Sequence, residues 1–159
     1  HSARDVEFQG FMADRALSTD FGDGIAAAKV ALAGHQGRVG MHGTDEGLDI
    51  DNKDAELRPI ITARFLKALE AAEAVGAHQM VLHSPYRQWY HNNRLAAPNY
   101  AQDKLERVHM VLNPVVRRAE EAGITLVIEN IEDVDPATRR GLVDSFDSPA
   151  VTLSLIHTS

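Results

Sequence analysis

Short β-type runs alternate with longer helical segments along this chain, and this alternation restricts the fold more than any other feature. The runs expected to be strands are 4–11, 38–43, 78–85, 124–130 and 150–156. The segments expected to be helices lie between them, at 22–34, 54–76, 102–123 and 135–146. Parallel strands need such crossover connections, so the alternation indicates a parallel sheet covered by helices. The sequence therefore predicts an α/β fold with five parallel strands in sequential order and four helices on the outer face.

The two long helical segments carry the clearest local signals. Apolar residues recur four apart on one face of segment 54–76: Leu57, Ile61, Phe65 and Leu69. Segment 102–123 has a similar stripe and contains Pro114, which should bend the helix. Gly76 and Gly123 follow the two stripes directly and are typical of helix ends. Both segments are therefore expected to be helices that pack against the sheet through one apolar face.

Composition narrows the classes of function. A chain of 159 residues that is 44% hydrophobic is long enough for one domain with its own core. The absence of cysteine excludes a disulfide framework, a thiolate metal site and a cysteine nucleophile. The net charge of −7 makes nucleic acid an unlikely partner, and no apolar run is long enough to span a bilayer. No signal-peptide pattern opens the chain, so we expect a cytoplasmic protein.

Polar side chains collect where the predicted strands end. His42, His83 and Glu129 close three consecutive strands, and Asn130 follows Glu129. In parallel α/β folds the chemistry gathers at the carboxyl ends of the strands. Two neutral imidazoles and a carboxylate on neighbouring strands suit a divalent metal or a polyhydroxy substrate. Either histidine alone would more simply be a polar residue at the rim of the sheet, but the three residues together favour a site.

Other candidates have weaker support. Glu7 lies in the first strand and faces either the site or solvent. Trp89, in the polar and aromatic loop 86–100, either covers a substrate or packs the loop onto the domain. Three histidines away from the strand ends are expected to be structural or solvated: His35, His78 and His109. The sequence has no GxGxxG or GxxxxGK[ST] phosphate loop and no GxSxG nucleophile elbow.

Three stretches carry a family resemblance: AEAVGAHQMVLHSP (72–85), RRAEEAGITLVIENIED (117–133) and FDSPAVTLSL (146–155). They resemble the xylose-isomerase-like family of sugar and sugar-phosphate isomerases and epimerases, which also includes repair enzymes of the endonuclease IV type. The resemblance covers most of the chain. It implies a (β/α)₈ TIM barrel that binds a divalent ion (Mn, Mg, Co or Zn) at its top.

The resemblance assigns roles by position. Glu129 matches a glutamate that binds the metal and often transfers the proton. His42 and His83 match histidines that touch substrate in the isomerases and bind zinc in the endonuclease branch. Asn130, Glu7 and Trp89 are expected near the substrate.

The chain departs from the family pattern in two ways. A TIM barrel has eight strands and about 250 residues, and the five strands expected here correspond to the second to sixth. We therefore expect residues 1–159 to be one incomplete barrel domain. The strand after SPAVTLSL normally ends in Asp-x-Gly-His, whereas here it ends in Ile156-His157-Thr158-Ser159. His157 could replace the aspartate as a metal ligand, although a shift of one residue turns a side chain to the other face of a strand.

The resemblance and the strand-end residues lead to one principal hypothesis. It is a metal-dependent isomerase or epimerase that acts on a sugar or sugar phosphate, with Glu129 moving a proton next to a carbonyl. One alternative is zinc-dependent hydrolysis of a phosphodiester at abasic DNA, which the acidic balance disfavours. Another is an inactive barrel fragment that forms a homo-oligomer by pairing its open edges with another chain.

Overall fold

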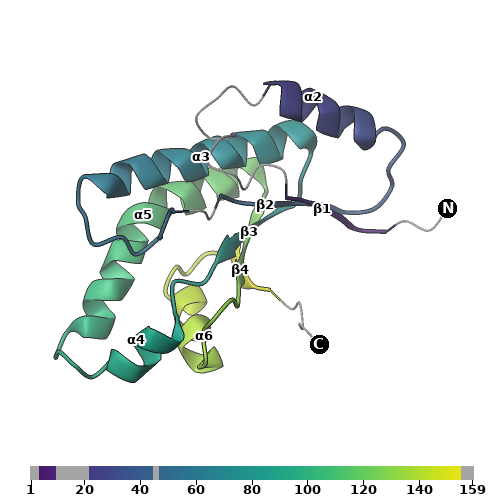
Figure 1. Ribbon diagram of the computed structural model, residues 1–159. Coiled ribbons are helices and arrows are strands. Elements are labelled where there is room, and N and C mark those ends of the chain that lie inside the picture. Colours follow the sequence, from purple (N-terminus) through teal and green to yellow (C-terminus); the bar gives the residue numbers. More distant parts are fainter. Residues whose placement is uncertain (1–3, 10–21, 45–46, 155–159) are drawn as a thin grey trace.

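Five parallel strands form one sheet whose order follows the chain (Figure 1). The computed structural model describes residues 4–9, 22–44 and 47–154. Within them the strands are β1 (Val6–Phe8), β2 (Val39–His42), β3 (Gln79–His83), β4 (Thr125–Glu129) and β5 (Val151–Leu153). Each strand pairs in parallel with the next one along the chain. The predicted sheet, with sequential order and parallel strands, is confirmed.

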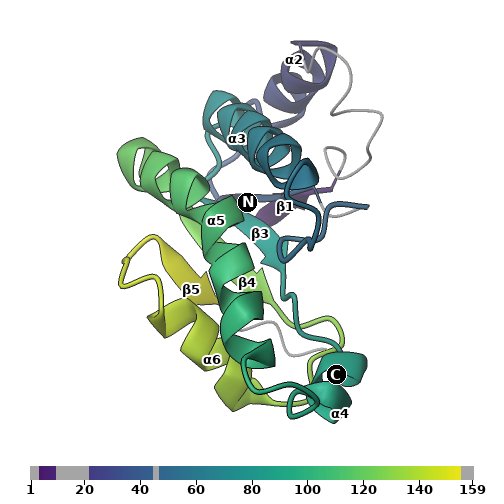
Figure 2. The ribbon, with the colours of Figure 1, turned by 90° about the vertical axis from the view of Figure 1, so that its left-hand side faces the viewer.

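The helices connect these strands. They are α2 (Gly22–Ala31), α3 (Leu57–Val75), α4 (Gln88–Asn93), α5 (Tyr100–Ala122) and α6 (Pro136–Asp144). Figure 2 shows α3, α5 and α6 on the same face of the sheet. The four predicted helices are present, and α4 is an addition within the segment expected to be a loop. None of the described helices is long and apolar enough to cross a membrane.

Local sequence signals fix the helix ends. Gly76 and Gly123 adopt left-handed φ values of 73° and 67°, and their N–H groups bond to carbonyls of the last helical turn. A glycine has no Cβ to oppose this conformation, so it ends a helix at little cost. At the start of α6, the Asp135 carboxylate accepts the N–H of Ala137, and Pro136 occupies the first turn.

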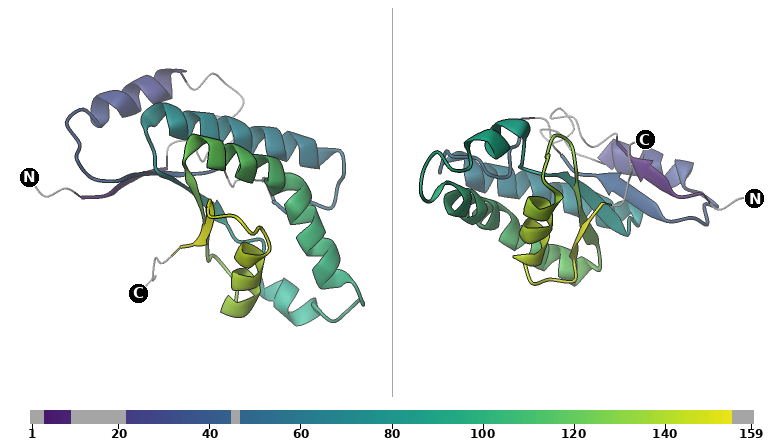
Figure 3. Two further views of the ribbon diagram at one scale, coloured as in Figure 1. Left: turned by 180° about the vertical axis from the view of Figure 1, so that it is seen from behind. Right: turned by 90° about the horizontal axis from the view of Figure 1, so that it is seen from below.

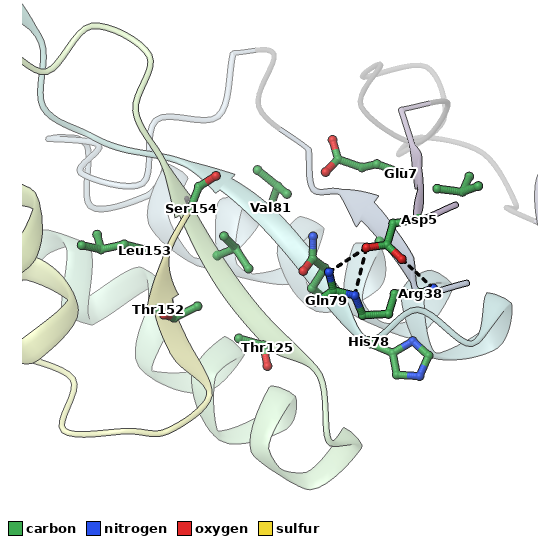
Figure 4. A pocket seen from close by; sticks show the side chains of 13 residues that line it. Asp5, Glu7, Arg38, His78, Gln79, Val81, Thr125, Thr152, Leu153 and Ser154 are labelled. Carbon is green, nitrogen blue, oxygen red and sulfur yellow. Dashed lines mark hydrogen bonds and ion pairs between the residues drawn. The ribbon is translucent and has the colours of Figure 1, made fainter. Parts of the chain in front are cut away.

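The sheet has two chemically different faces. Residues that point toward the helices are apolar and fully buried: Met41, Met80, Leu82, Leu126 and Ile128. The alternate residues point away from the helices and line a hollow of about 660 Å³: Glu7, Gly40, Gln79, Val81, Thr125, Val127, Thr152 and Ser154. Figure 4 shows this inner face, with the Asp5–Arg38 ion pair (2.7 Å) at its margin. The core therefore lies between the sheet and its helices.

Helix α5 bends as the sequence predicts, and Figure 3 shows the change of direction. Pro114 lies inside the helix and has no N–H to offer the preceding turn. On this turn the hydroxyl of Thr62, from α3, lies 3.0 Å from the Val111 carbonyl. The same hydroxyl lies 3.1 Å from the Arg58 carbonyl of its own helix. The contact to Val111 ties α3 to α5 at the bend.

Candidate metal centre

The register of the sheet brings three predicted residues together. His83 and Glu129 are direct partners across β3 and β4, and His42 pairs with Val81, two residues before His83. Side chains alternate along a strand, so residues two apart share a face. All three side chains therefore project on the inner face at the carboxyl end of the sheet.

The distances within the group are those of metal ligands. His42 Nε2 lies 3.1 Å from His83 Nε2 and 3.6 Å from Glu129 Oε2, and His83 Nε2 lies 3.9 Å from Glu129 Oε2. Zinc bonds of 2.0–2.1 Å in a tetrahedral arrangement separate two ligand atoms by about 3.4 Å. One ion could therefore contact all three atoms without a large rearrangement.

A backbone carbonyl sets the tautomer of His42. Its Nδ1 lies 2.8 Å from the carbonyl oxygen of Gly43, which only accepts hydrogen bonds. The neutral ring therefore carries its proton on Nδ1, and the lone pair of Nε2 faces His83 and Glu129. A metal-binding histidine is commonly held in this way through its other nitrogen.

Exposure differs across the three residues. The side chain of His42 is 5% exposed, against 22% for Glu129 and 32% for His83. Among the residues that the structure describes, these three form a His/Asp/Glu group able to share an ion. The site is thus buried at one end and open at the other.

The structure does not bring the other predicted residues into this group. Asn130 Oδ1 accepts the backbone N–H of Asp133 at 3.1 Å, within the loop after β4. Glu7 lies opposite Gly40, two residues before His42, and lines the hollow of the inner face (Figure 4). Trp89, on α4, is 62% exposed, with its ring 6.2 Å from that of Tyr100. Contacts of these three residues with a substrate stay predictions, and His157 lies outside the described residues.

A buried lysine behind the site has no counterpart among the sequence predictions. Lys104 is 5% exposed and forms an ion pair with Asp51, and its Nζ lies over the rings of Tyr86 and Tyr90 at 5.6 and 5.3 Å. Burial lowers the pKa of Lys104, and the nearby Asp51 carboxylate opposes this shift. The sequence holds one signal, because Lys104 precedes Val108 by four residues and so lies on the apolar stripe of α5.

The pair borders the candidate metal centre. Asp51 and His83 line the same small cavity of about 40 Å³, together with Thr44 and Ser84. Arg87 bonds to Asp49 at 3.2 Å and closes the same region from the loop after β3. The loops that follow β2 and β3 are thus joined beside His83.

Solved structures share this fold. A D-tagatose 3-epimerase-like protein superposes with a TM-score of 0.75 at 18% identity, over 96% of this chain and 56% of that one. The TTHB071 protein from Thermus thermophilus, soaked with ZnCl2, gives 0.66 at 22% identity, over 94% and 55%. D-Psicose 3-epimerase in the presence of D-fructose gives 0.68 at 18% identity, over 94% and 52%. The chain thus spans about half the length of these proteins.

Comparison with curated proteins gives no match. The sequence profile of the xylose isomerase-like TIM barrel family matches residues 1–155. This range covers all five strands and the three residues of the candidate metal centre. The chain belongs to the xylose isomerase-like TIM barrel family.

Proposed function

We propose that the chain carries part of the active site of a metal-dependent sugar isomerase or epimerase. The observation that supports this most is the convergence of His42 Nε2, His83 Nε2 and Glu129 Oε2, which all lie within 4.8 Å of one another. The names of two structural neighbours, a D-tagatose 3-epimerase-like protein and a D-psicose 3-epimerase, support a sugar substrate.

The donor atoms fit a divalent ion. Two imidazole nitrogens and one carboxylate oxygen suit zinc, cobalt or manganese better than magnesium, which prefers oxygen ligands throughout. The neighbour soaked with ZnCl2 agrees with this preference. When bound, the ion would act as a Lewis acid on the sugar carbonyl.

Glu129 is the proposed proton carrier. Its Oε2 faces the two histidines, which leaves Oε1 to accept a proton from the carbon next to the carbonyl. The C–H bonding pair then becomes the C=C bond of an enediol, and the same carboxyl group returns the proton at the neighbouring carbon or on the original one. His42 and His83 hold the site in place around this carboxylate.

Proton abstraction is measurable without net turnover. We would strip the chain with a chelator, reload it with Co²⁺, Mn²⁺ or Zn²⁺, and follow deuterium incorporation from D₂O into a ketohexose by NMR. The expected result is metal-dependent exchange beside the carbonyl, lost in Glu129→Gln. His109→Gln is the matched control, since His109 bonds to Ser145 on the outer helices and lies away from the site. The proposal fails if the wild-type chain binds none of these ions at micromolar concentration, or if Glu129→Gln exchanges at the wild-type rate.

Zinc-dependent phosphodiester hydrolysis remains the second candidate, because two of the three donor atoms are histidine nitrogens of the kind that zinc favours. The net charge of −7 opposes binding of a polyanion. The same zinc-loaded protein is offered an oligonucleotide with an abasic site. Cleavage of this oligonucleotide without any deuterium exchange would replace the first proposal with the second.

A further inference from the structure

We propose that Gly43 is a positioning residue of the metal centre, which it serves by holding the His42 ring. This inference deepens the proposed function and rests on the metal site described above. Gly43 follows His42 directly at the end of β2. It needs no contact of its own with the ion.

Two hydrogen bonds fix the backbone at Gly43. Its carbonyl oxygen accepts the Nδ1–H of His42 at 2.8 Å. Its own N–H donates to the carbonyl oxygen of Val81, also at 2.8 Å. The acceptor for the His42 ring is therefore anchored to β3, the strand that carries His83.

There is no room for a side chain at this position. A Cβ on Gly43 would lie 2.8 Å from the Val81 carbonyl oxygen and 2.9 Å from Leu82 Cδ2. The first of these atoms belongs to the backbone of a central strand, which cannot give way easily. Gly43 does not have a positive φ, so the constraint is space and not conformation. Any other residue must move away from β3 and take its carbonyl with it.

Displacing this carbonyl changes the atom that His42 presents to a metal. His42 is 4% exposed, so water has little access to replace the lost acceptor. Without a partner for Nδ1–H, the tautomer protonated on Nε2 becomes competitive. That tautomer places a hydrogen on the nitrogen that faces His83 and Glu129.

Metal affinity tests the inference. We would measure the Kd of the purified full chain for Co²⁺ and Zn²⁺ by competition with a chromophoric chelator. Gly43→Ala is expected to weaken binding about 10- to 100-fold, the usual effect of losing an outer-shell partner. Gly141→Ala is the matched control, because an added Cβ on this α6 glycine meets no atom within 4 Å. Its affinity should equal that of the wild type.

The tautomer of His42 separates positioning from simple loss of stability. Long-range ¹H–¹⁵N correlation spectra of the metal-free protein at one pH assign the protonated nitrogen. We expect Nδ1–H in the wild type and in Gly141→Ala, and a raised fraction of Nε2–H in Gly43→Ala. The wild-type spectrum alone overturns the inference if Nδ1 is the unprotonated nitrogen, even where Gly43→Ala does not fold.

The outcomes for Gly43 and for the proposed function are distinct. If the wild-type chain binds no metal, the proposed function fails, while the spectra still test whether Gly43 holds His42. If the wild type binds metal and Gly43→Ala binds it equally well, the positioning role is wrong and the proposed function stands. Weaker binding with an unchanged tautomer also contradicts the positioning role, because the loss then comes from general destabilisation.

Discussion

At the scale of single residues, the Asp51–Lys104 pair is the most sensitive point outside the metal centre. Lys104 is buried and its charge has one carboxylate partner close by. Removing one partner of a buried pair leaves an uncompensated charge, which costs far more than a surface pair contributes. Asp51→Asn is therefore expected to lower the free energy of unfolding by about 3 kcal/mol. Urea unfolding measures this change.

The control for this prediction is an exposed pair of the same type. Arg140 and Asp144 lie 3.0 Å apart on the surface of α6. Asp144→Asn should change the free energy of unfolding by less than about 0.5 kcal/mol. Similar losses in the two variants would show that the buried pair has no special role.

Tyr86 gives the protein a predictable response to alkali. Burial, then the neighbouring Tyr90, Asp51 and Asp133, raise the pKa of the Tyr86 hydroxyl. A tyrosine whose pKa is higher in the folded state contributes stability below its unfolded pKa of about 10, and this is lost as the pH rises toward the folded pKa. Urea midpoints of the wild type should fall relative to Tyr86→Phe between about pH 9 and pH 11. A constant difference between the two proteins over this range would exclude the effect.

Residue-level prediction from sequence succeeded where strand periodicity decides position. His42, His83 and Glu129 each end a strand, so a parallel sheet brings them together whatever the helices do. The hold of Gly43 on His42 depends on the approach of β2 to the Val81 carbonyl, and no local pattern reports that distance. The partner of Lys104 lies 53 residues away in sequence, so its ion pair was equally invisible.

At the scale of elements, the contact between α3 and α5 depends on a single hydroxyl. Thr62 Oγ1 bonds to the Val111 carbonyl near the bend that Pro114 introduces. Thr62→Val keeps the shape of the side chain but removes this donor. We expect a loss of about 1 kcal/mol in the free energy of unfolding, with Thr62→Ser close to the wild type. If thermal unfolding shows Thr62→Val to be as stable as Thr62→Ser, the hydroxyl does not tie the helices.

Element prediction was accurate for long periodic segments and failed for a short one. The stripe that begins at Leu57 and the closing Gly76 identified α3 to within a few residues. Helix α4 has only six residues, too few for a periodic pattern. It is held by tertiary packing instead, since Tyr90 is buried against Tyr86 and stacks on Tyr100.

At the scale of the molecule, the sheet is covered on one face. Helices bury the outer face, whereas the inner face has a hollow of about 660 Å³. Within the described residues, β1 and β5 each pair on one side only. Unpaired strand edges beside an uncovered face promote association. We therefore expect the 159-residue chain alone to self-associate or to melt at low temperature, and to show at most weak isomerase activity.

Light scattering after size-exclusion chromatography, combined with thermal unfolding at several concentrations, tests this expectation. Self-association predicts a mass above that of one chain and a Tm that rises with concentration. A monomer that unfolds cooperatively at a high, concentration-independent Tm would contradict it.

The topology of the whole sheet could be predicted because five strand-like runs separated by helices leave few arrangements open. The shape of the inner face could not, since it depends on which alternate set faces inward. Val127 belongs to this set and Leu126 to the outer one. Both are aliphatic, so hydrophobicity alone cannot assign them.

The gradient of exposure across the candidate metal centre implies an order of events in time. An arriving ion meets His83 and Glu129 first, since their side chains are open to solvent, and reaches His42 last. Loading would then follow a fast step that depends on ion concentration and a slower one that does not. Release would run in reverse, with His42 the last ligand to dissociate only if the outer two bonds break first. A buried innermost ligand thus lengthens the residence time of the ion more than it speeds its capture.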